Sequence, residues 1–400
     1  MEVLILKYSV ACCYLTHNHT DALSEILDRC LKLYADHGID IYILDDSDDR
    51  ATEELIREHI KNGAANLYYV DAHAAKNGDD KYLLAIRGYG LEKEYDYIWP
   101  SKDRVCFDEP FISQLCSAID EGPDVIVGAY ENARWDVGEN LEKSVYTDPC
   151  EFYRLYNVVC TNWECLIRKR STMLSPIDWD RYVRDYRLGP DNSFNQTITL
   201  FSRLSEMENC SIRICRYTEE RFISSKAASI WGNVMFELWI DKWVAANFSL
   251  PAIYDKYKAE AIKSQTNLTE LFGSVEGMIT FRNKGVYTKE VFEKYRNVWP
   301  FVSNIPVVHL EKIANGDYDD VLKETLIAFE QSFAEHDFKK AWWLIAANTY
   351  FGKYYDDRTY RILVGCFNRY RQDMMSRGES DVFTGISSLQ NLLDRYSFVK

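Results

Sequence analysis

The sequence of 400 residues lacks the features that mark several common classes of protein. No apolar run approaches the roughly 20 residues that a membrane-spanning helix needs, and no basic leader opens the chain, so neither a spanning segment nor a signal peptide is expected. Positive charge is scarce, because 47 Lys and Arg stand against 62 Asp and Glu and leave a net charge of −15. We therefore expect no nucleic-acid partner, since such proteins present a basic face to phosphates.

The signatures of several enzyme classes are missing as well. The sequence has no Gly-x-Ser-x-Gly elbow, no Walker loop and no Gly-x-Gly-x-x-Gly fingerprint, which disfavours hydrolase, kinase and dehydrogenase activity. The 7 histidines form no HExxH pair and the 11 cysteines form no CxxC pair, so a zinc site of the common kind is not expected. The cysteines are instead predicted to be buried, reduced thiols of a cytoplasmic protein.

Apolar strands and amphipathic helices alternate steadily through the first half of the chain. The spacing predicts strands over residues 8–15, 39–44, 67–70, 95–99, 124–130 and 211–217, and helices over 21–37, 51–61, 81–91, 111–120 and 194–205. Short connections between such elements are typical of right-handed βαβ units. We therefore predict an α/β domain with a mostly parallel sheet that helices cover on both faces.

After about residue 225 the pattern becomes helical. Helices are predicted over residues 227–247, 289–297, 318–335, 338–350, 358–376 and 385–396. The chain is thus expected to hold two domains, an α/β domain over 1–225 and an all-helical domain over 226–400. The helical domain would serve in packing, in homo-oligomerisation or in acceptor binding. At most peripheral membrane contact is expected, because its aromatic clusters lack a strongly basic flank.

Two of the predicted strands end in charged turns. The strand over 39–44 runs into an acidic stretch, Asp45 to Asp49, and the strand over 95–99 is soon followed by Lys102, Asp103 and Arg104. Ligands of open α/β sheets bind at the carboxyl ends of the strands. A carboxylate there can grip sugar hydroxyls or hold a divalent metal that carries a diphosphate. The two strand ends therefore point to nucleotide-sugar chemistry.

With the loop Thr16-His17-Asn18 that follows the first strand, these turns resemble the family 2 glycosyltransferases over roughly the first 220 residues. These are inverting enzymes of the GT-A fold, so the resemblance implies a GT-A, Rossmann-like domain. It also implies that Thr16, Asn18, Asp45 and Ser47 contact the nucleobase and ribose of the donor. The alternative interpretation of the acidic turn is a well-capped helix start.

The turn at Asp103 departs from the family pattern. Family members carry an Asp-x-Asp or Asp-Asp run that coordinates a divalent metal, whereas Arg104 and Val105 follow Asp103 here. Asp103 would then hold Mn²⁺ or Mg²⁺ with help from the diphosphate and water. Alternatively, Lys102 and Arg104 stabilise the leaving diphosphate without a metal. A solvated charged turn with no function is the third interpretation.

The resemblance also implies positions for the sugar and the acceptor. Asn162 and Trp163 would lie near them, and Asp191, just before the helix over 194–205, would be the catalytic base that deprotonates the acceptor hydroxyl. Asp178 and Asp180 compete with Asp191 for that role. As alternatives, Asp191 is the N-cap of the helix and Trp163 is a core residue.

The function expected from the sequence is transfer of a hexose from a nucleotide diphosphate sugar, UDP-linked, to a glycan or glycoprotein with inversion. The bacterial context that the resemblance implies is synthesis of surface polysaccharide or glycosylation of serine-rich adhesins. The first alternative is a catalytically silent GT-A scaffold that binds a partner transferase, motivated by the reduced acidic motif. A nucleotidyltransferase is the second, but it would need a Gly-rich, basic first loop that the chain lacks.

Overall fold

The computed structural model describes residues 6–130, 143–157, 159–217, 221–222, 231–268 and 275–335. The chain divides into two compact units, residues 1–265 and 266–400. The sequence pattern places the boundary earlier, after 225. The helical stretch that follows it belongs to the first unit because its aromatic side chains pack there. The ring of Trp243, for example, lies 4.8 Å from that of Phe194.

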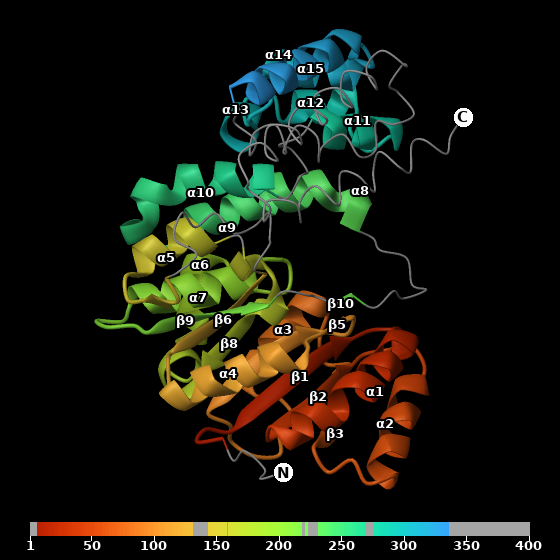
Figure 1. Cartoon of the computed structure of the whole chain (residues 1–400), viewed down its shortest axis with the longest axis vertical. Coiled ribbons are helices and arrows are strands. Elements are labelled where there is room, and N and C mark those ends of the chain that lie inside the picture. The colour runs from red at the N-terminus through yellow and green to blue at the C-terminus, as the bar shows by residue number, and fades with distance from the viewer. Residues whose placement is uncertain are drawn as a thin grey trace, which may run out of the picture. The chain divides into compact units, whose positions relative to one another are not determined.

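One mixed sheet organises the first unit (Figure 1). In the described part of the chain it has the strand order β3-β2-β1-β4-β8-β6-β9-β7, and only β8 and β7 run antiparallel to their neighbours. Its strands are β1 (Val10–Thr16), β2 (Ile39–Asp45), β3 (Leu67–Asp71), β4 (Tyr97–Lys102), β6 (Val125–Tyr130), β7 (Val145–Tyr146), β8 (Leu166–Lys169) and β9 (Ile212–Tyr217). A separate antiparallel pair joins β5 (Val105–Cys106) to β10 (Arg221–Phe222).

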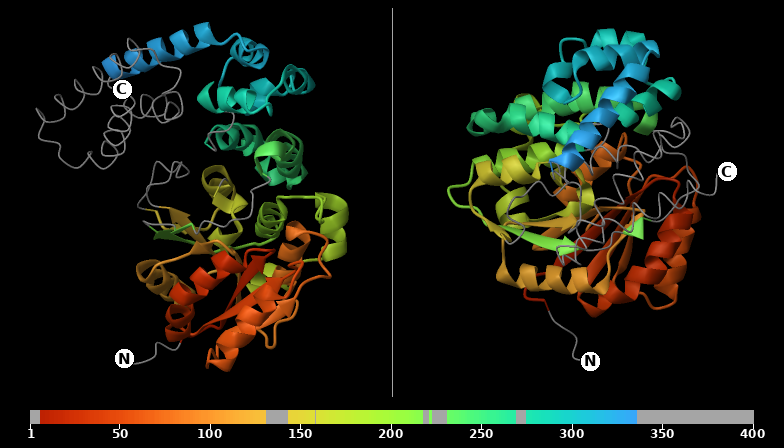
Figure 2. Two further views of the ribbon diagram at one scale, coloured as in Figure 1. Left: turned by 90° about the vertical axis from the view of Figure 1, so that its right-hand side faces the viewer. Right: turned by 45° about the horizontal axis from the view of Figure 1, so that its top comes forward.

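Helices cover both faces of this sheet, and the core accordingly has two parts (Figure 1, Figure 2). The helices of the first unit are α1 (Thr20–Asp36), α2 (Ala51–Lys61), α3 (Gly78–Arg87), α4 (Glu109–Glu121), α5 (Pro149–Tyr156), α6 (Trp179–Tyr186), α7 (Asn195–Ser205), α8 (Trp231–Phe236), a π-helical turn (Glu237–Lys242), α9 (Trp243–Ser249) and α10 (Asp255–Leu268), which runs past the end of the unit. One part of the core packs α1, α2 and α4 on the sheet. The other packs α3, α5, α7 and α9 on the opposite face.

The predicted fold class, an α/β domain with a mostly parallel sheet followed by helices, is confirmed for the described residues. Every residue of β1 is buried, which is why its sequence reads as a continuous apolar run. The pattern gave no sign of β8, a short antiparallel strand between β4 and β6. Arg168 lies inside it fully buried, with its guanidinium bonded to the hydroxyls of Tyr82 and Thr199.

The second unit is helical throughout its described residues. Its helices are α11 (Val275–Asn283), α12 (Lys289–Lys294), α13 (Trp299–Val302), α14 (Val307–Asn315) and α15 (Asp319–Ala334). Trp299 is fully buried among them, with Tyr287 and Tyr295 against its ring. The helices predicted over 338–350, 358–376 and 385–396 lie outside the described residues. Among the helices that are described, none has both the length and the apolar character that crossing a bilayer requires.

The cysteines of the described ranges are all free thiols, and all but Cys150 are buried. Burial raises the pKa of the Cys13 thiol to about 12. A thiol held in the protonated form is a poor nucleophile and a poor metal ligand. These cysteines therefore behave as small core residues, in line with the sequence interpretation.

Gly90, which leads from α3 toward β4, is expected to tolerate no side chain. Its φ of +71° is unfavourable for other residues, and an added Cβ would lie 2.4 Å from Cγ1 of Val70 on β3. Gly38 is the matched control, because its φ is +69° and an added Cβ there has no neighbour within 4 Å. Gly38→Ala should lower the free energy of unfolding by about 1 kcal/mol, from backbone strain alone. Gly90→Ala should cost roughly 1–3 kcal/mol more, because β-branched Val70 cannot easily move away. Urea unfolding of the two variants measures the difference, and equal losses would contradict the overlap.

Candidate active site

The carboxyl ends of four parallel strands form one edge of the sheet, here called the strand-end rim: Thr16, Asp45, Asp71 and Lys102. The pairing register brings them into line, because Thr16 pairs with Asp45, Asp45 pairs with Asp71, and Leu15 next to Thr16 pairs with Lys102. Asp103 follows Lys102 directly. The two charged turns singled out from the sequence therefore lie at the same edge, with β1 between them. This is the place where open α/β sheets bind ligands.

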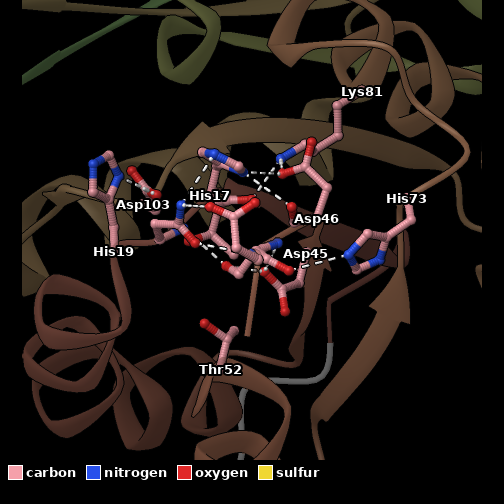
Figure 3. A network of polar contacts seen from close by, with 12 residues as sticks. His17, His19, Asp45, Asp46, Thr52, His73, Lys81 and Asp103 are labelled. Carbon is pink, nitrogen blue, oxygen red and sulfur yellow. Dashed lines mark hydrogen bonds and ion pairs between the residues drawn. The ribbon is translucent and has the colours of Figure 1, made fainter. Parts of the chain in front are cut away.

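The loop after β1 touches both charged turns (Figure 3). Asn18 accepts a hydrogen bond from the backbone N–H of Asp48 at 2.9 Å and donates one from its amide to the Asp48 carboxylate at 2.7 Å. Its own backbone N–H reaches Ser47 Oγ at 2.8 Å. Asn18 has a φ of +59°, a region that Asn adopts more readily than most residues. On the other side of the loop, His19 Nδ1 lies 2.8 Å from Asp103 Oδ2.

Asp45 is buried at the start of the acidic turn and accepts the hydrogen bonds that hold the turn in shape. Its side chain is only 1% exposed, and one oxygen accepts from the backbone N–H and the hydroxyl of Ser47, at 3.0 and 2.5 Å. The other oxygen accepts from the Tyr69 hydroxyl at 3.2 Å. Burial and the nearby Asp45 charge raise the pKa of Tyr69. Asp45 and Ser47 therefore determine the shape of the turn, while Asp48 and Asp49 at its tip are exposed.

The acidic turn precedes α2 but does not cap it in the expected way. The N-cap position is Arg50, which makes no side-chain capping bond. Asp49 instead accepts a hydrogen bond from the backbone N–H of Ala51 at 2.9 Å. Within the acidic stretch, Asp49 thus binds the start of the helix. The capping interpretation accounts for Asp49 and not for the other carboxylates of the stretch.

A buried lysine holds this loop and turn together. Lys81, on α3, has a side chain only 3% exposed, and its ammonium donates to the backbone carbonyl of Thr16 and to the carboxylate of Asp46. His17 Nδ1 lies 3.1 Å from the same oxygen of Asp46. Figure 3 shows Lys81 and His17 both directed at Asp46. Because a buried ammonium needs its partners, these contacts fix α3 against the loop after β1.

The end of β3 adds a pair of residues to the rim. His73 Nδ1 lies 2.7 Å from the carboxylate of Asp71, and its Nε2 lies 3.1 Å from the backbone carbonyl of Ser47. The hydrogen bond to Asp71 raises the pKa of His73, while the bonds from the His73 backbone and ring lower the pKa of Asp71. Both side chains are more than half exposed, at 58% for His73 and 71% for Asp71, so this pair is accessible to a ligand.

Asp103 is the residue that the resemblance assigns to a metal. It is 6% exposed, and one of its oxygens is held by His19. Nowhere in the described ranges do three or more His, Cys, Asp or Glu side chains gather in a way that could hold a metal ion. A divalent ion at Asp103 would have to take most of its oxygen ligands from a bound diphosphate and from water. The residues that the structure describes do not by themselves supply a complete site.

Lys102 is held by an anionic partner within the fold. Its ammonium lies 2.9 Å from Glu164 Oε1 and 3.1 Å from Asn162 Oδ1, and its side chain is 35% exposed. Glu164 is 1% exposed, and its Oε2 has no hydrogen-bond partner among the described residues. The charge of Lys102 thus balances a buried carboxylate, and Glu164 and Asn162 fix where the ammonium lies. Arg104, two residues on, is half-buried.

The N-terminus of α3 lies beside the segment that contains Asn162 and Trp163. The ring of Trp163 stacks on that of Tyr82, with centroids 5.6 Å apart, and a Cβ added to Gly78 would lie 3.4 Å from the Trp163 ring. Trp163 is half-buried and packs on α3 through this stacking contact. Both the core role and a stacking role for Trp163 are compatible with this geometry.

The turn that carries Asp191 also meets the N-terminus of α3. This turn, residues 189–193, is tied to α3 by a bond of 2.8 Å from the Asn77 amide to the Pro190 carbonyl. A second bond, of 3.2 Å, runs from the Ser193 hydroxyl to the carboxylate of Asp79. Burial raises the pKa of Asp79 to about 6; the Ser193 bond and the Lys242 charge oppose the rise, and the Asp191 charge adds to it.

Asp191 itself is exposed in the 189–193 turn. The interpretation of Asp191 as the helix cap is wrong, because the N-cap position of α7 is Phe194, three residues further on. Asp178, by contrast, is the N-cap of α6, where it accepts from the backbone N–H of Arg181 at 3.0 Å. Asp180 lies in the first turn of the same helix. Of the three carboxylates considered for the base, Asp191 is thus the one that neither caps nor lies within a helix.

The structure therefore brings the predicted residues together in two groups joined by α3. Thr16, Asn18, Asp45, Ser47, Lys102 and Asp103 lie at or beside the strand-end rim. Asn162, Trp163 and Asp191 lie near the N-terminus of α3. Their roles as ligand contacts stay predictions, and Thr16, Asp45 and Ser47 are buried.

Sequence reasoning assigned no functional role to the residues of α3 that join these two groups. Lys81 carried a usable signal, since a lysine four residues before the buried Ala85 lies on the apolar face of the predicted helix. Asp79 and Asp80 carried only the signal of an acidic first turn, which helices commonly have. The contact of His19 with Asp103 joins positions far apart in the chain, and no local pattern marks it.

Comparison with known proteins gives similarity to solved structures only. No protein-family model and no curated protein matches the sequence. A structure of S. aureus TarS 1-349 has 10% identity and a TM-score of 0.41, covering 78% of this chain and 89% of its own. The mannosyltransferase PcManGT from Pyrobaculum calidifontis, in complex with GDP-Man and Mn²⁺, has 12% identity and a TM-score of 0.41, covering 78% and 88%.

Glucosyl-3-phosphoglycerate synthase from Mycobacterium tuberculosis, in complex with Mn²⁺, UDP and glucosyl-3-phosphoglycerate, is a third similar structure. It has 12% identity and a TM-score of 0.38, covering 61% of this chain and 80% of its own.

The Lys102–Glu164 contact predicts an asymmetry between single and double variants. Lys102→Met should lower the free energy of unfolding by about 2 kcal/mol, because it leaves the buried Glu164 carboxylate without a counter-charge. Adding Glu164→Gln should recover most of that loss. Lys93→Met is the control, since Lys93 pairs with Asp40 at 2.8 Å but is 57% exposed, and it should cost less than about 1 kcal/mol. Urea unfolding measures all three variants, and a double variant no more stable than Lys102→Met would contradict the charge balance.

Proposed function

We propose that this chain is a glycosyltransferase that moves a hexose from a nucleotide diphosphate sugar to an acceptor hydroxyl, with inversion at the anomeric carbon. The donor is UDP-linked and the acceptor is a glycan or glycoprotein, as the resemblance implies. The observation that carries the proposal is the position of α3. Its residue Lys81 anchors the strand-end rim, and Asn77 and Asp79 at its N-terminus bind the turn of Asp191. Transfer requires a donor site and a proton acceptor close together, and one helix joins the candidates for both.

The nucleobase and ribose of the donor would lie over the rim at the loop after β1. Asn18 is the exposed member of the predicted set and presents an amide there. Thr16, Asp45 and Ser47 are buried, so their contribution is first to hold the loop and the acidic turn in shape. Preformed polar groups lower the cost of ordering the site when the donor binds.

The diphosphate would lie toward Lys102 and Arg104. Because Glu164 and Asn162 already fix the Lys102 ammonium, it needs little reorganisation as charge develops on the leaving group. Mn²⁺ or Mg²⁺ bound at Asp103 would supply further neutralisation of the diphosphate. The steps assigned to the chain's own residues do not depend on that ion.

The acceptor would approach near the N-terminus of α3, with Asn162 and Trp163 beside the sugar. The acceptor oxygen attacks the anomeric carbon as the bond from that carbon to the diphosphate breaks. Asp191 takes the proton that the hydroxyl loses. A single displacement of this kind inverts the configuration of the sugar.

A catalytically silent scaffold remains the second candidate. The observation that favours it is Asp103, a single carboxylate already held by His19, where the resemblance implies an acidic run. Such a protein would bind a partner transferase through its helical half. The same half is our candidate for homo-oligomerisation.

A thermal-shift screen of UDP-, GDP-, CMP- and dTDP-sugars tests the donor assignment. UDP-sugars should stabilise the full chain most, by about 2.7 kcal/mol at a ligand concentration 100 times Kd. Stabilisation and turnover without Mn²⁺ would support the roles of Lys102 and Arg104. Activity that vanishes in EDTA and returns with Mn²⁺ would count against a metal-free leaving group. No turnover with any sugar, alongside retained binding of a partner, would favour the scaffold.

Asp191→Asn should reduce transfer at least 100-fold while leaving donor affinity intact, because it removes the proton acceptor and little else. Rates of nucleoside diphosphate release and donor affinities from calorimetry separate the two effects. Asp180→Asn, in the neighbouring helix α6, is the control and should keep both. Equal loss of transfer and of donor affinity in Asp191→Asn would show that Asp191 is structural.

A further inference from the structure

We propose that Asp79 at the N-terminus of α3 forms a pair with Asp191, and that the two carboxylates share the proton that the acceptor hydroxyl releases. This inference rests on the proposed transferase function and adds a second carboxyl to the base. Asp79 was not among the residues that the sequence singled out.

Two tethers bring the two carboxylates into one environment. The Asn77 amide donates to the carbonyl of Pro190, the residue just before Asp191, at 2.8 Å. The hydroxyl of Ser193, two residues after Asp191, donates to Asp79 Oδ2 at 3.2 Å. Asp191 is thus flanked on both sides by residues that bind the first turn of α3. Asn77 also accepts from the backbone N–H of Asp80 as the N-cap of the helix, which keeps this turn rigid.

The charges around Asp79 come from three elements. The 189–193 turn contributes Asp191, and the π-helical turn before α9 contributes Lys242. On α3 itself, the carboxylate of Asp80 accepts a hydrogen bond from the backbone N–H of Lys76. Lys81 is directed away, toward Asp46. Asp79 is half-buried, and burial is the main reason that its pKa rises to about 6. A carboxyl that titrates there is still ionised at neutral pH and is a stronger base than an ordinary aspartate.

The position of Asp79 fits the geometry of transfer. Gly78, the residue before it, lies against Trp163, and Asn162 next to Trp163 contacts the Lys102 ammonium. Asp79 therefore lies between the residues assigned to the sugar and the turn assigned to the base. A tryptophan face with nearby hydrogen-bonding groups suits the hydroxyls of a sugar acceptor.

The step itself balances with the groups named. A bond forms between the acceptor oxygen and the anomeric carbon, and the bond from that carbon to the diphosphate breaks with its electron pair on the diphosphate. The hydroxyl proton passes to the ionised pair. Two neighbouring carboxylates repel one another, so the pair holds one proton more firmly than a lone carboxylate does. Activity should therefore require both carboxylates to be ionised at the start.

The pH dependence of turnover tests the pairing in the full chain. With the UDP-sugar that the screen selects, the acid limb of the kcat profile should lie near pH 6 in the unmodified protein. In Asp79→Asn the acid limb should move to lower pH because the like charge beside the remaining carboxylate is gone, and kcat at pH 7 should fall with little change in donor KM. Asp79→Glu should keep the acid limb near pH 6. Asp80→Asn, which changes the adjacent acid, should leave the profile unchanged.

Carboxyl ¹³C NMR gives a readout that needs no turnover. One resonance should titrate near pH 6, be absent in Asp79→Asn, and titrate at lower pH in Asp191→Asn, because loss of a like charge eases ionisation. If the titration midpoint of the Asp79 resonance is the same in Asp191→Asn as in the unmodified protein, the pairing is overturned even if transfer is observed. If the pH dependence of kcat is unchanged in Asp79→Asn, the role of Asp79 in catalysis is overturned. If Asp79 and Asp191 titrate as a coupled pair but the protein turns over no nucleotide sugar, the transferase reaction is rejected. The catalytic role of the pair is then rejected as well.

Discussion

The burial of one ammonium group constrains the whole candidate site. Lys81 lies on the apolar face of α3, away from water, and a charge in such a place is tolerated only if it is paired. Its partners are the last residue of β1 and the carboxylate of Asp46 in the acidic turn. The same carboxylate receives His17, and the same loop reaches Asp103 through His19. The geometry of both charged turns thus depends on where a single helix places its lysine.

The strands at the centre of the sheet were predictable from the sequence because they are buried on both faces and read as continuous apolar runs. Parallel pairing then places their ends at one edge, so the proximity of Asp45 and Asp103 followed from the pattern alone. Strand β8 was not predictable, since it is short and carries Arg168 in the core. Nor was the contact of His19 with Asp103, because only the folded chain brings those loops together.

The two groups of candidate residues differ in how they are built. At the strand-end rim, buried groups such as Asp45 and Ser47 make the shape, and exposed ones such as Asn18 and His73 complete it. Near the N-terminus of α3, a half-buried carboxyl and an exposed one lie on elements tied by hydrogen bonds. The rim is suited to recognition through many fixed polar groups, and the helix end is suited to handling a proton.

The attachment of α3 at two points has a mechanical consequence. Lys81 and Asn77 lie about one helical turn apart at the N-terminal end of α3, and they bind different segments of the chain. A tilt of α3 that broke the contact of Lys81 with the loop after β1 would also displace the turn that carries Asp191. Binding of a ligand that moves either segment is therefore expected to move the other, because both are bound to the N-terminal turn of α3.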